Sequence, residues 1–209
     1  VLATLEGGKR DYQGVEVTFK KLRTDNWNML ASYTYNDAEG NTNSDGNADL
    51  QGDFYYLDPR APNMYAKQPG NVDHQFKILG TYYFDNGFEL GAVYNWNSGT
   101  AYNRATNVYG RLLPLREEST YDFGGFEGRW IAPGNTASQE TPAYGTLDIR
   151  VKYKHDFGGY QAEFFLDVFN VLDDQAVVEE EQLVAGSGTY EFGEAKDWVA
   201  PRRLYLSLI

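Results

Sequence analysis

The sequence predicts an all-β fold, a segment of a transmembrane antiparallel β-barrel, over all 209 residues. Three observations support this prediction. Seven runs place an apolar residue at every second position, the connections alternate between short turns and long loops, and charged residues keep to one face of the runs. We expect a single domain, residues 1–209, that supplies about seven strands of a larger barrel.

Strict alternation assigns each run to a strand, because successive side chains of a strand point to opposite faces. In chain order the runs cover residues 14–22, 27–36, 75–84, 88–97, 146–154, 162–169 and 204–208. Several reach about ten residues, which at a ~45° tilt spans an apolar band of roughly 25 Å. A soluble sandwich is the alternative, but its strands are usually ~5–6 residues long.

The connections alternate in length as they do in membrane barrels. Short turns are expected at 24–26, 85–87 and 156–159, and long loops at about 37–72, 98–143 and 173–197. The three long loops together carry the whole formal net charge of −12. We expect the short turns at the periplasmic side and the long loops outside, and an odd count of strands requires further strands to close the barrel.

The two faces of the predicted strands differ in charge and in aromatic content. One face carries every charged residue of the runs, namely Glu16, Lys20, Lys77, Glu89, Asp148, Arg150, Lys152, Glu163, Asp167 and Arg203. The other face is uncharged and carries aromatics near the strand ends: Trp27, Phe84, Phe88 and Tyr153 beside the short turns, and Tyr35 and Trp96 beside the long loops. This is the pattern of a lipid-facing surface with two interfacial girdles.

Composition excludes several functions. The 30 acidic residues outnumber the 18 basic ones, so a nucleic-acid binder of the usual basic kind is not expected. The absence of cysteine removes disulfides, thiolate zinc sites and cysteine nucleophiles. The two histidines, His74 and His155, fall at opposite ends of the predicted strands and cannot share a catalytic site. We therefore expect no enzyme and no cofactor.

One segment of the first long loop suggests a metal site. Asp45, Asn47 and Asp49 place oxygen ligands at alternate positions, as a calcium loop does. The twelfth position counted from Asp45 is Tyr56, where a calcium loop has a bidentate glutamate. Ordinary turn chemistry is the alternative to an extracellular Ca²⁺ site.

The middle long loop combines arginines with aromatic residues, a composition common in recognition surfaces. The candidate ligand-contacting residues are Tyr102, Arg104, Arg111, Arg116, Arg129 and Trp130. The same composition also suits a loop that packs on itself. If the loop recognises a ligand, arginine suits anionic groups and the aromatic rings suit planar ones.

Several short motifs occur in a familiar order. They are Asn71-Val72-Asp73-His74-Gln75-Phe76-Lys77, Asn97-Ser98-Gly99-Thr100-Ala101-Tyr102, Thr146-Leu147-Asp148-Ile149-Arg150, Phe165-Leu166-Asp167-Val168-Phe169-Asn170-Val171-Leu172 and Ala200-Pro201-Arg202-Arg203. In this order and spacing they resemble the C-terminal part of TonB-dependent outer-membrane receptors, in particular the Oar-like group that carries a carboxypeptidase-regulatory-like domain.

The resemblance implies a barrel of about 22 strands in the bacterial outer membrane, with a plug inside it. Its implied partners are the rest of the barrel and the plug, the TonB complex, outer-membrane lipid and lipopolysaccharide, and a small-molecule, peptide or glycan ligand. The implied function is active import of a ligand that the extracellular loops bind. The plug and the TonB box are absent from these residues, and the chain stops at Ile209 where the family usually ends on an aromatic, so both ends are expected to be fragment ends. A docking barrel that anchors a surface complex and a passive porin are the alternatives.

Overall fold

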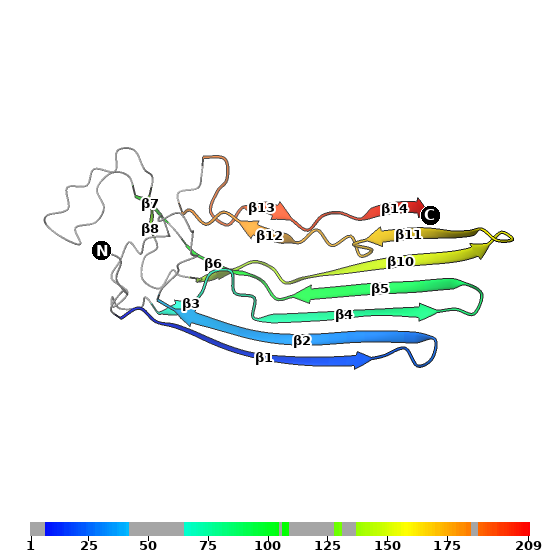
Figure 1. The fold of residues 1–209 in the computed structure, drawn as a ribbon. Helices are drawn as coiled ribbons and strands as arrows, with labels where there is room; N and C mark the ends of the chain where they lie inside the picture. The colour runs from blue at the N-terminus through cyan, green and yellow to red at the C-terminus, as the bar shows by residue number, and fades with distance from the viewer. Residues whose placement is uncertain (1–6, 42–64, 105, 109–127, 131–136, 185–187) are drawn as a thin grey trace, which may run out of the picture.

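The structure, a computed structural model, describes residues 7–41, 65–104, 106–108, 128–130, 137–184 and 188–209. Seven long strands form one antiparallel sheet in which neighbours along the chain are also neighbours in space (Figure 1). They are β1 (Arg10–Lys21), β2 (Trp27–Gly40), β4 (His74–Tyr83), β5 (Phe88–Asn97), β10 (Tyr144–Asp156), β11 (Gln161–Phe169) and β14 (Arg203–Leu208). The predicted all-β antiparallel fold and its seven strands are confirmed. Among the described residues, no helix is long and apolar enough to cross a membrane.

The three short connections all lie at the same end of the sheet (Figure 1). Gly87 turns the chain between β4 and β5 at a φ of 86°, and its amide donates to the carbonyl of Phe84. Between β10 and β11, the amides of Gly158 and Gly159 both donate to the Asp156 carboxylate, and both glycines have positive φ. Glycine adopts such left-handed conformations without steric cost, which allows these tight turns.

Short strands occupy parts of the long connections, and the sequence analysis did not predict them. They are β3 (Ala66–Lys67), β6 (Ala101–Tyr102), β7 (Thr106–Val108), β8 (Gly128–Trp130), β9 (Gln139–Glu140), β12 (Val177–Glu180) and β13 (Ala195–Trp198). They are too short to show an alternating pattern, and the β12–β13 pair is further interrupted by register shifts. Strand β2 also continues to Gly40, into residues predicted as loop.

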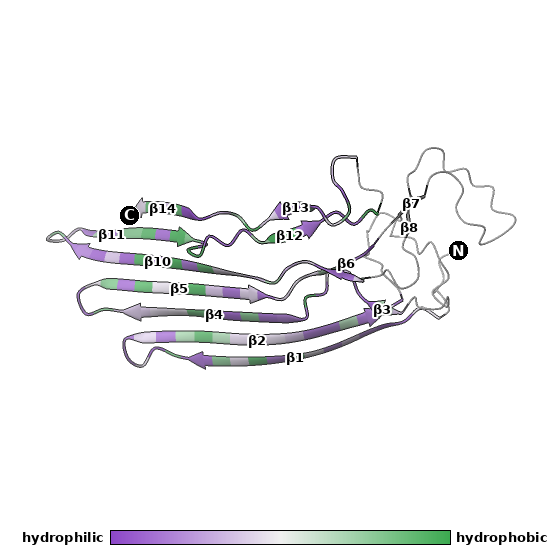
Figure 2. Cartoon of the chain, turned by 180° about the vertical axis from the view of Figure 1, so that it is seen from behind, coloured by the Kyte–Doolittle hydropathy of each residue, from purple (hydrophilic) through white to green (hydrophobic). Residues whose placement is uncertain are grey.

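The registers place the residues of the seven strands on two faces. Arg150 lies opposite Gly91 on β5 and Asp167 on β11, and Lys77 lies opposite Ser32 on β2 and Asn95 on β5. Followed across the sheet, these rows bring all the predicted charged positions onto one face, which we call the polar face. The alternation of hydrophobic and hydrophilic residues is visible along β2 and β5 (Figure 2).

The opposite, apolar face has no protein packed on it among the described residues. Val17, Tyr82, Leu90 and Leu206 of this face are all exposed, the last to 84 %. The buried apolar side chains of the described residues are few and lie outside the long strands: Ala101, Tyr102 and Leu183. A sandwich would bury one face of its sheet against a second layer. The single sheet with a bare apolar face is instead what a barrel wall in lipid requires.

Aromatic side chains of the apolar face gather at both ends of the strands, as predicted. Near the short turns, the rings of Phe88 and Tyr153 stack with centroids 4.4 Å apart. At the other end, His74 lies 5.3 Å from the ring of Tyr35 and accepts or donates a 2.8 Å hydrogen bond with the Tyr33 hydroxyl. Amphipathic rings at these two levels suit the two interfaces of a bilayer.

Candidate functional site

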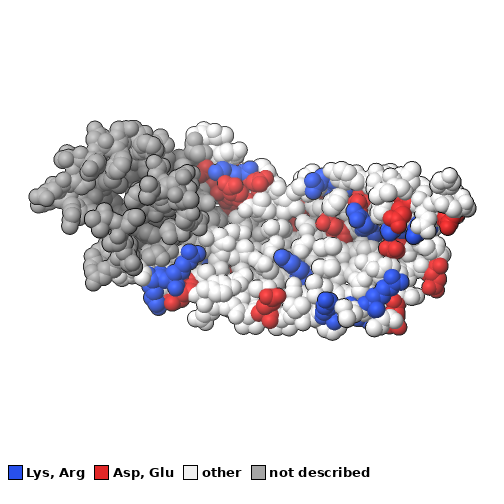
Figure 3. All heavy atoms as spheres, in the orientation of Figure 1, with Lys and Arg blue, Asp and Glu red and all other residues white. Residues whose placement is uncertain are grey.

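The polar face near the short turns neutralises its own charges. Arg150 forms a two-pronged pair with Asp167, with Nε–Oδ1 and Nη2–Oδ2 distances of 2.5 and 2.8 Å. Lys152 lies 3.0 Å from a Glu163 oxygen and 3.8 Å from a Glu89 oxygen. Acidic and basic side chains lie side by side at this end of the molecule, at the right of Figure 3. These groups pair with one another across strands and leave little charge to offer a ligand.

The same face differs toward the long connections. One row across the sheet joins Thr34, Gln75 and Asn97, and the next row joins Ser32, Lys77 and Asn95. We call these six residues the Lys77 patch. Within the part of the chain that the structure describes, its side chains form no hydrogen bond or ion pair. The patch is therefore a half-exposed polar surface with unused donors and acceptors.

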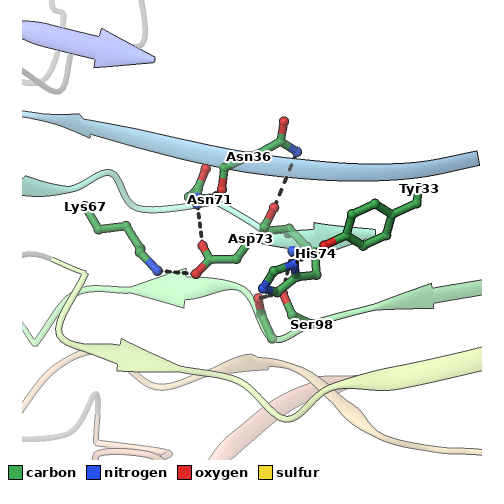
Figure 4. Close-up of polar contacts among 9 residues, drawn as sticks. Tyr33, Asn36, Lys67, Asn71, Asp73, His74 and Ser98 are labelled. Carbon is green, nitrogen blue, oxygen red and sulfur yellow. Dashed lines mark hydrogen bonds and ion pairs between the residues drawn. The ribbon is translucent and has the colours of Figure 1, made fainter. Parts of the chain in front are cut away.

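A polar cluster lies where the connection from β2 enters β4 (Figure 4). Lys67 Nζ contacts Asp73 Oδ2 at 2.5 Å, and Asn71 Nδ2 donates to Asp73 Oδ1 at 2.6 Å. The hydrogen bond with Asp73 raises the pKa of Lys67, so this pair stays charged at neutral pH. Asn36 joins the cluster by donating its backbone amide to the carbonyl of Asp73. The cluster fixes the start of β4, where the sequence showed only a motif.

A junction around Asn170 was missed by the sequence analysis, which quoted this residue only within a motif. Asn170 follows β11 in the left-handed conformation, with φ of 49°, and is 4 % exposed. Its Nδ2 donates to the carbonyls of Asp174 and Ala200, and its backbone amide donates to Asp148 Oδ1 of β10. One side chain thus joins the ends of β10 and β11 to the segment that leads into β14. An asparagine directly after a strand was the available signal, because asparagine tolerates positive φ.

Two of the six candidate ligand-contacting residues lie in the described part of the middle connection with their side chains. Tyr102 is buried in β6, and its hydroxyl donates a short hydrogen bond to Glu180 of β12. Burial raises the pKa of Tyr102, and the bond to Glu180 raises it further, so the hydroxyl stays protonated and acts as donor. Arg104 is exposed and lies over the ring of Phe192, 5.2 Å from its centroid. Both contacts tie the middle connection to the last one.

The other candidates are only partly placed. Arg129 and Trp130 belong to β8, which pairs with β7 so that Arg129 lies opposite Asn107. Arg111 and Arg116 lie outside the described residues, and so do the predicted calcium ligands Asp45, Asn47 and Asp49. The recognition surface and the Ca²⁺ site stay predictions. Within the described ranges, no three His, Asp or Glu side chains are grouped as metal ligands.

The two histidines lie at opposite ends of the sheet. His74 begins β4 beside the long connections, and its backbone amide donates to the hydroxyl of Ser98. His155 is next to the last residue of β10, at the short-turn end, and pairs across the sheet with Ala162. The strands separate the two imidazoles by their whole length, so no acid–base pair can be formed from them.

Comparison with solved structures identifies the architecture. The chain is similar to the ferric-catecholate import receptor Fiu from E. coli K12, with a TM-score of 0.56 and 18 % identity over 96 % of the chain. It is also similar to the siderophore receptor PiuA from Acinetobacter baumannii, with a TM-score of 0.53 and 16 % identity over 96 % of the chain. A third match is the outer-membrane transporter YddB from Escherichia coli, with a TM-score of 0.56 and 11 % identity over 97 % of the chain.

The chain has the fold of a wall segment of an outer-membrane receptor barrel. It spans 21–25 % of the length of these three proteins, which agrees with the prediction of a partial barrel. No protein-family model and no curated protein matches the chain. The predicted Oar-like subgroup therefore stays a prediction.

Proposed function

We propose that this chain forms the C-terminal part of the barrel wall of an active-transport receptor in the bacterial outer membrane. The receptor binds its ligand from outside through the long connections and imports it with energy that TonB delivers to a plug. The plug, the TonB complex and the ligand are partners proposed for the whole protein, of which this chain is the wall.

The observation that carries the proposal is the two-sided sheet. Its apolar face is bare and aromatic at both ends, whereas its polar face holds charged pairs such as Arg150 with Asp167. This division suits a wall between lipid and a wet lumen. The similarity to solved import receptors along nearly the whole chain supports transport over a purely structural barrel.

We also infer that the chain does no covalent chemistry on its ligand. His74 and His155 are separated by the length of the strands, and the described residues contain no cluster of metal-ligating side chains. The acidic residues of the Glu179–Glu181 segment contact Tyr102 and Lys196 rather than facing an open site. Binding and passage are the remaining tasks for such a wall.

The full-length protein in its own bacterium tests this function. Cells with and without a working TonB system are incubated in a defined mixture of siderophores, peptides and oligosaccharides, and the loss of each solute from the medium is measured. We expect one class of solute to be depleted only when both the protein and TonB are present. TonB-independent depletion, together with large stable conductance of the purified protein in planar bilayers, would identify a passive porin instead.

A further inference from the structure

Lys77 occupies an unusual electrostatic position on the polar face. Its cross-strand neighbours are Ser32 and Asn95, and its neighbours along β4 on the same face are Gln75 and Leu79. The four diagonal positions are uncharged as well: Leu30, Thr34, Val93 and Asn97. No carboxylate therefore adjoins this exposed ammonium group on the sheet.

Basic residues nearer the short turns are treated differently by the same sheet. Lys152 has glutamates on both neighbouring strands, Glu89 on β5 and Glu163 two residues from its partner on β11. Arg150 holds Asp167 through two parallel hydrogen bonds. A cross-strand carboxylate is thus within the design of this wall, and its absence around Lys77 leaves one positive charge available.

The residues around Lys77 supply hydrogen bonds without competing charge. Gln75, Asn95 and Asn97 carry carboxamides, which both donate and accept, and Ser32 and Thr34 carry hydroxyls. Below them on the same face lie Leu79 and Val93, which are 41 % and 38 % exposed. The surface therefore offers a cation, several neutral donors and acceptors, and an apolar floor.

We propose that the Lys77 patch binds the carboxylate or phosphate group of a polyhydroxylated ligand on the inner wall of the barrel. Lys77 pairs with the anionic group, and the surrounding amides and hydroxyls bond to the ligand's hydroxyl groups. Hydrogen-bonding groups and fixed charges lining a pore decide which solutes it accepts. This inference rests on the proposed transport function, because it requires the polar face to line the ligand's path.

The position of the patch favours a ligand over another segment of the protein. The patch lies toward the long connections, which are the end from which an external solute arrives. The charged pairs near the short turns lie deeper along the same path. An incoming solute meets the patch while its unpaired lysine and amides are still available.

The test uses the purified full-length protein in lipid nanodiscs. The probes are digalacturonate and glucose 6-phosphate, with digalactose and glucose as uncharged counterparts, and binding is measured by calorimetry at two salt concentrations. We expect the anionic probes to bind more tightly than the neutral ones, and their binding to weaken as salt rises. The lysines are also reductively methylated with ¹³C, and we expect the Lys77 signal to shift when an anionic probe is added.

Three variants separate this site from a general effect of charge. Lys77→Gln should weaken binding of the anionic probes roughly 10- to 100-fold, since a charge-assisted hydrogen bond is lost. Lys77→Arg should retain most of the binding. Lys20→Gln, on the polar face of β1 near the short turns, is the matched control and should change nothing. Binding of neutral probes should be the same in the parent and in Lys77→Gln.

Several outcomes would overturn the proposal. One is that the parent binds no anionic probe at millimolar concentration, and another is that Lys77→Gln binds as well as the parent. A third is that the methylated Lys77 is shielded from solvent in the ligand-free protein and that Lys77→Gln lowers thermal stability, which would mean that an acidic group of the protein itself occupies the patch. These in vitro results do not depend on TonB, so failure of the transport assay is distinguishable from failure of this site.

Discussion

The two faces of the sheet are stabilised by different partners. The apolar face presents side chains such as Leu90 and Leu206 to its surroundings with no protein against them, whereas the polar face holds its side chains through contacts within the chain. A hydrophobic residue at the surface of a soluble sheet would be a liability of this size. In lipid, the same face is satisfied by the solvent it lies in, and specificity is left to the polar face.

This difference explains why the chain can be a stable wall with almost no core. Apolar residues on alternate positions need only the bilayer, so they impose no shape complementarity on one another. Polar residues need defined partners, so they carry the information that fixes strand ends and register. Substitutions on the two faces should therefore fail for different reasons and by different amounts. All measurements below refer to the full-length barrel.

The largest effect is expected from a charge placed at mid-strand on the apolar face. Ile78 and Leu79 are adjacent in the middle of β4 and point to opposite faces. Ile78→Arg should lower the free energy of folding by roughly 2–4 kcal/mol, because the guanidinium faces the centre of the hydrocarbon. Thermal unfolding of the protein in nanodiscs measures the change.

Leu79→Arg is the control for this comparison, because it introduces the same side chain one residue away on the polar face. Its effect should be well under that of Ile78→Arg. Equal loss of stability in the two variants would contradict the assignment of the faces and would indicate that β4 is packed on both sides.

The next effect in size concerns Asn170, the buried side chain that joins three segments. Asn170→Ala removes both Nδ2 donors and leaves the carbonyls of Asp174 and Ala200 without that partner. We expect a loss of about 2 kcal/mol in the free energy of unfolding, part of it from the left-handed backbone. Asn170→Gly tolerates the backbone conformation and should lose about 1 kcal/mol less. If the two variants are equally stable, backbone conformation contributes nothing here.

The strands were predictable from the sequence because the bilayer enforces alternation. The runs around Phe76 and Leu90 alternate strictly, since any polar residue on their apolar face would lie in lipid. Their ends were less predictable, because they depend on single polar contacts such as that of Lys67 with Asp73. Strand β2 extends to Gly40 since β3 pairs with its end, which no local pattern revealed.

The candidate site was predictable in part for the same reason. Alternation placed Lys77 on the charged face, but its isolation from carboxylates follows only from the registers of β2, β4 and β5. The short strands of the long connections depend on contacts between distant segments. Tyr102 and Glu180, for example, are 78 positions apart and meet across two connections. Composition alone named Tyr102 as a ligand contact and could not reveal its partner.

A smaller effect is expected from the ion pair on the polar face. Asp167→Asn removes the charge that Arg150 contacts, but Arg150 is 58 % exposed and water can replace the carboxylate. We expect a loss of at most about 1 kcal/mol, since solvent screens exposed pairs. Thermal unfolding in low and high salt checks this, and the difference between parent and variant should shrink as salt rises. A loss as large as that of Ile78→Arg would mean that this part of the polar face is dry.

The smallest effect should be local and pH-dependent, at the base of the last long connection. The Asp173 carboxylate accepts the backbone amide of Arg202 at 2.9 Å, and its other oxygen lies 3.4 Å from the guanidinium. The amide hydrogen bond lowers the pKa of Asp173, with a further contribution from the Arg202 charge. A carboxyl whose pKa is lowered by folding stabilises the folded state above its unfolded pKa of about 3.9, and that contribution is lost as the pH falls through the lower folded pKa.

We therefore expect the Arg202 amide to be protected at pH 6 and to lose protection near pH 3. Hydrogen exchange followed by mass spectrometry measures this, after correction for the intrinsic pH dependence of exchange. Asp173→Asn is the control, because asparagine tolerates the positive φ of 56° at this position and does not titrate. The variant should show weaker protection that does not change between the two pH values. Equal pH dependence in the parent and in Asp173→Asn would assign the acid sensitivity to another group, with the neighbouring Asp174 as the next to test, since its carboxylate accepts the backbone amides of Ala176 and Gly145.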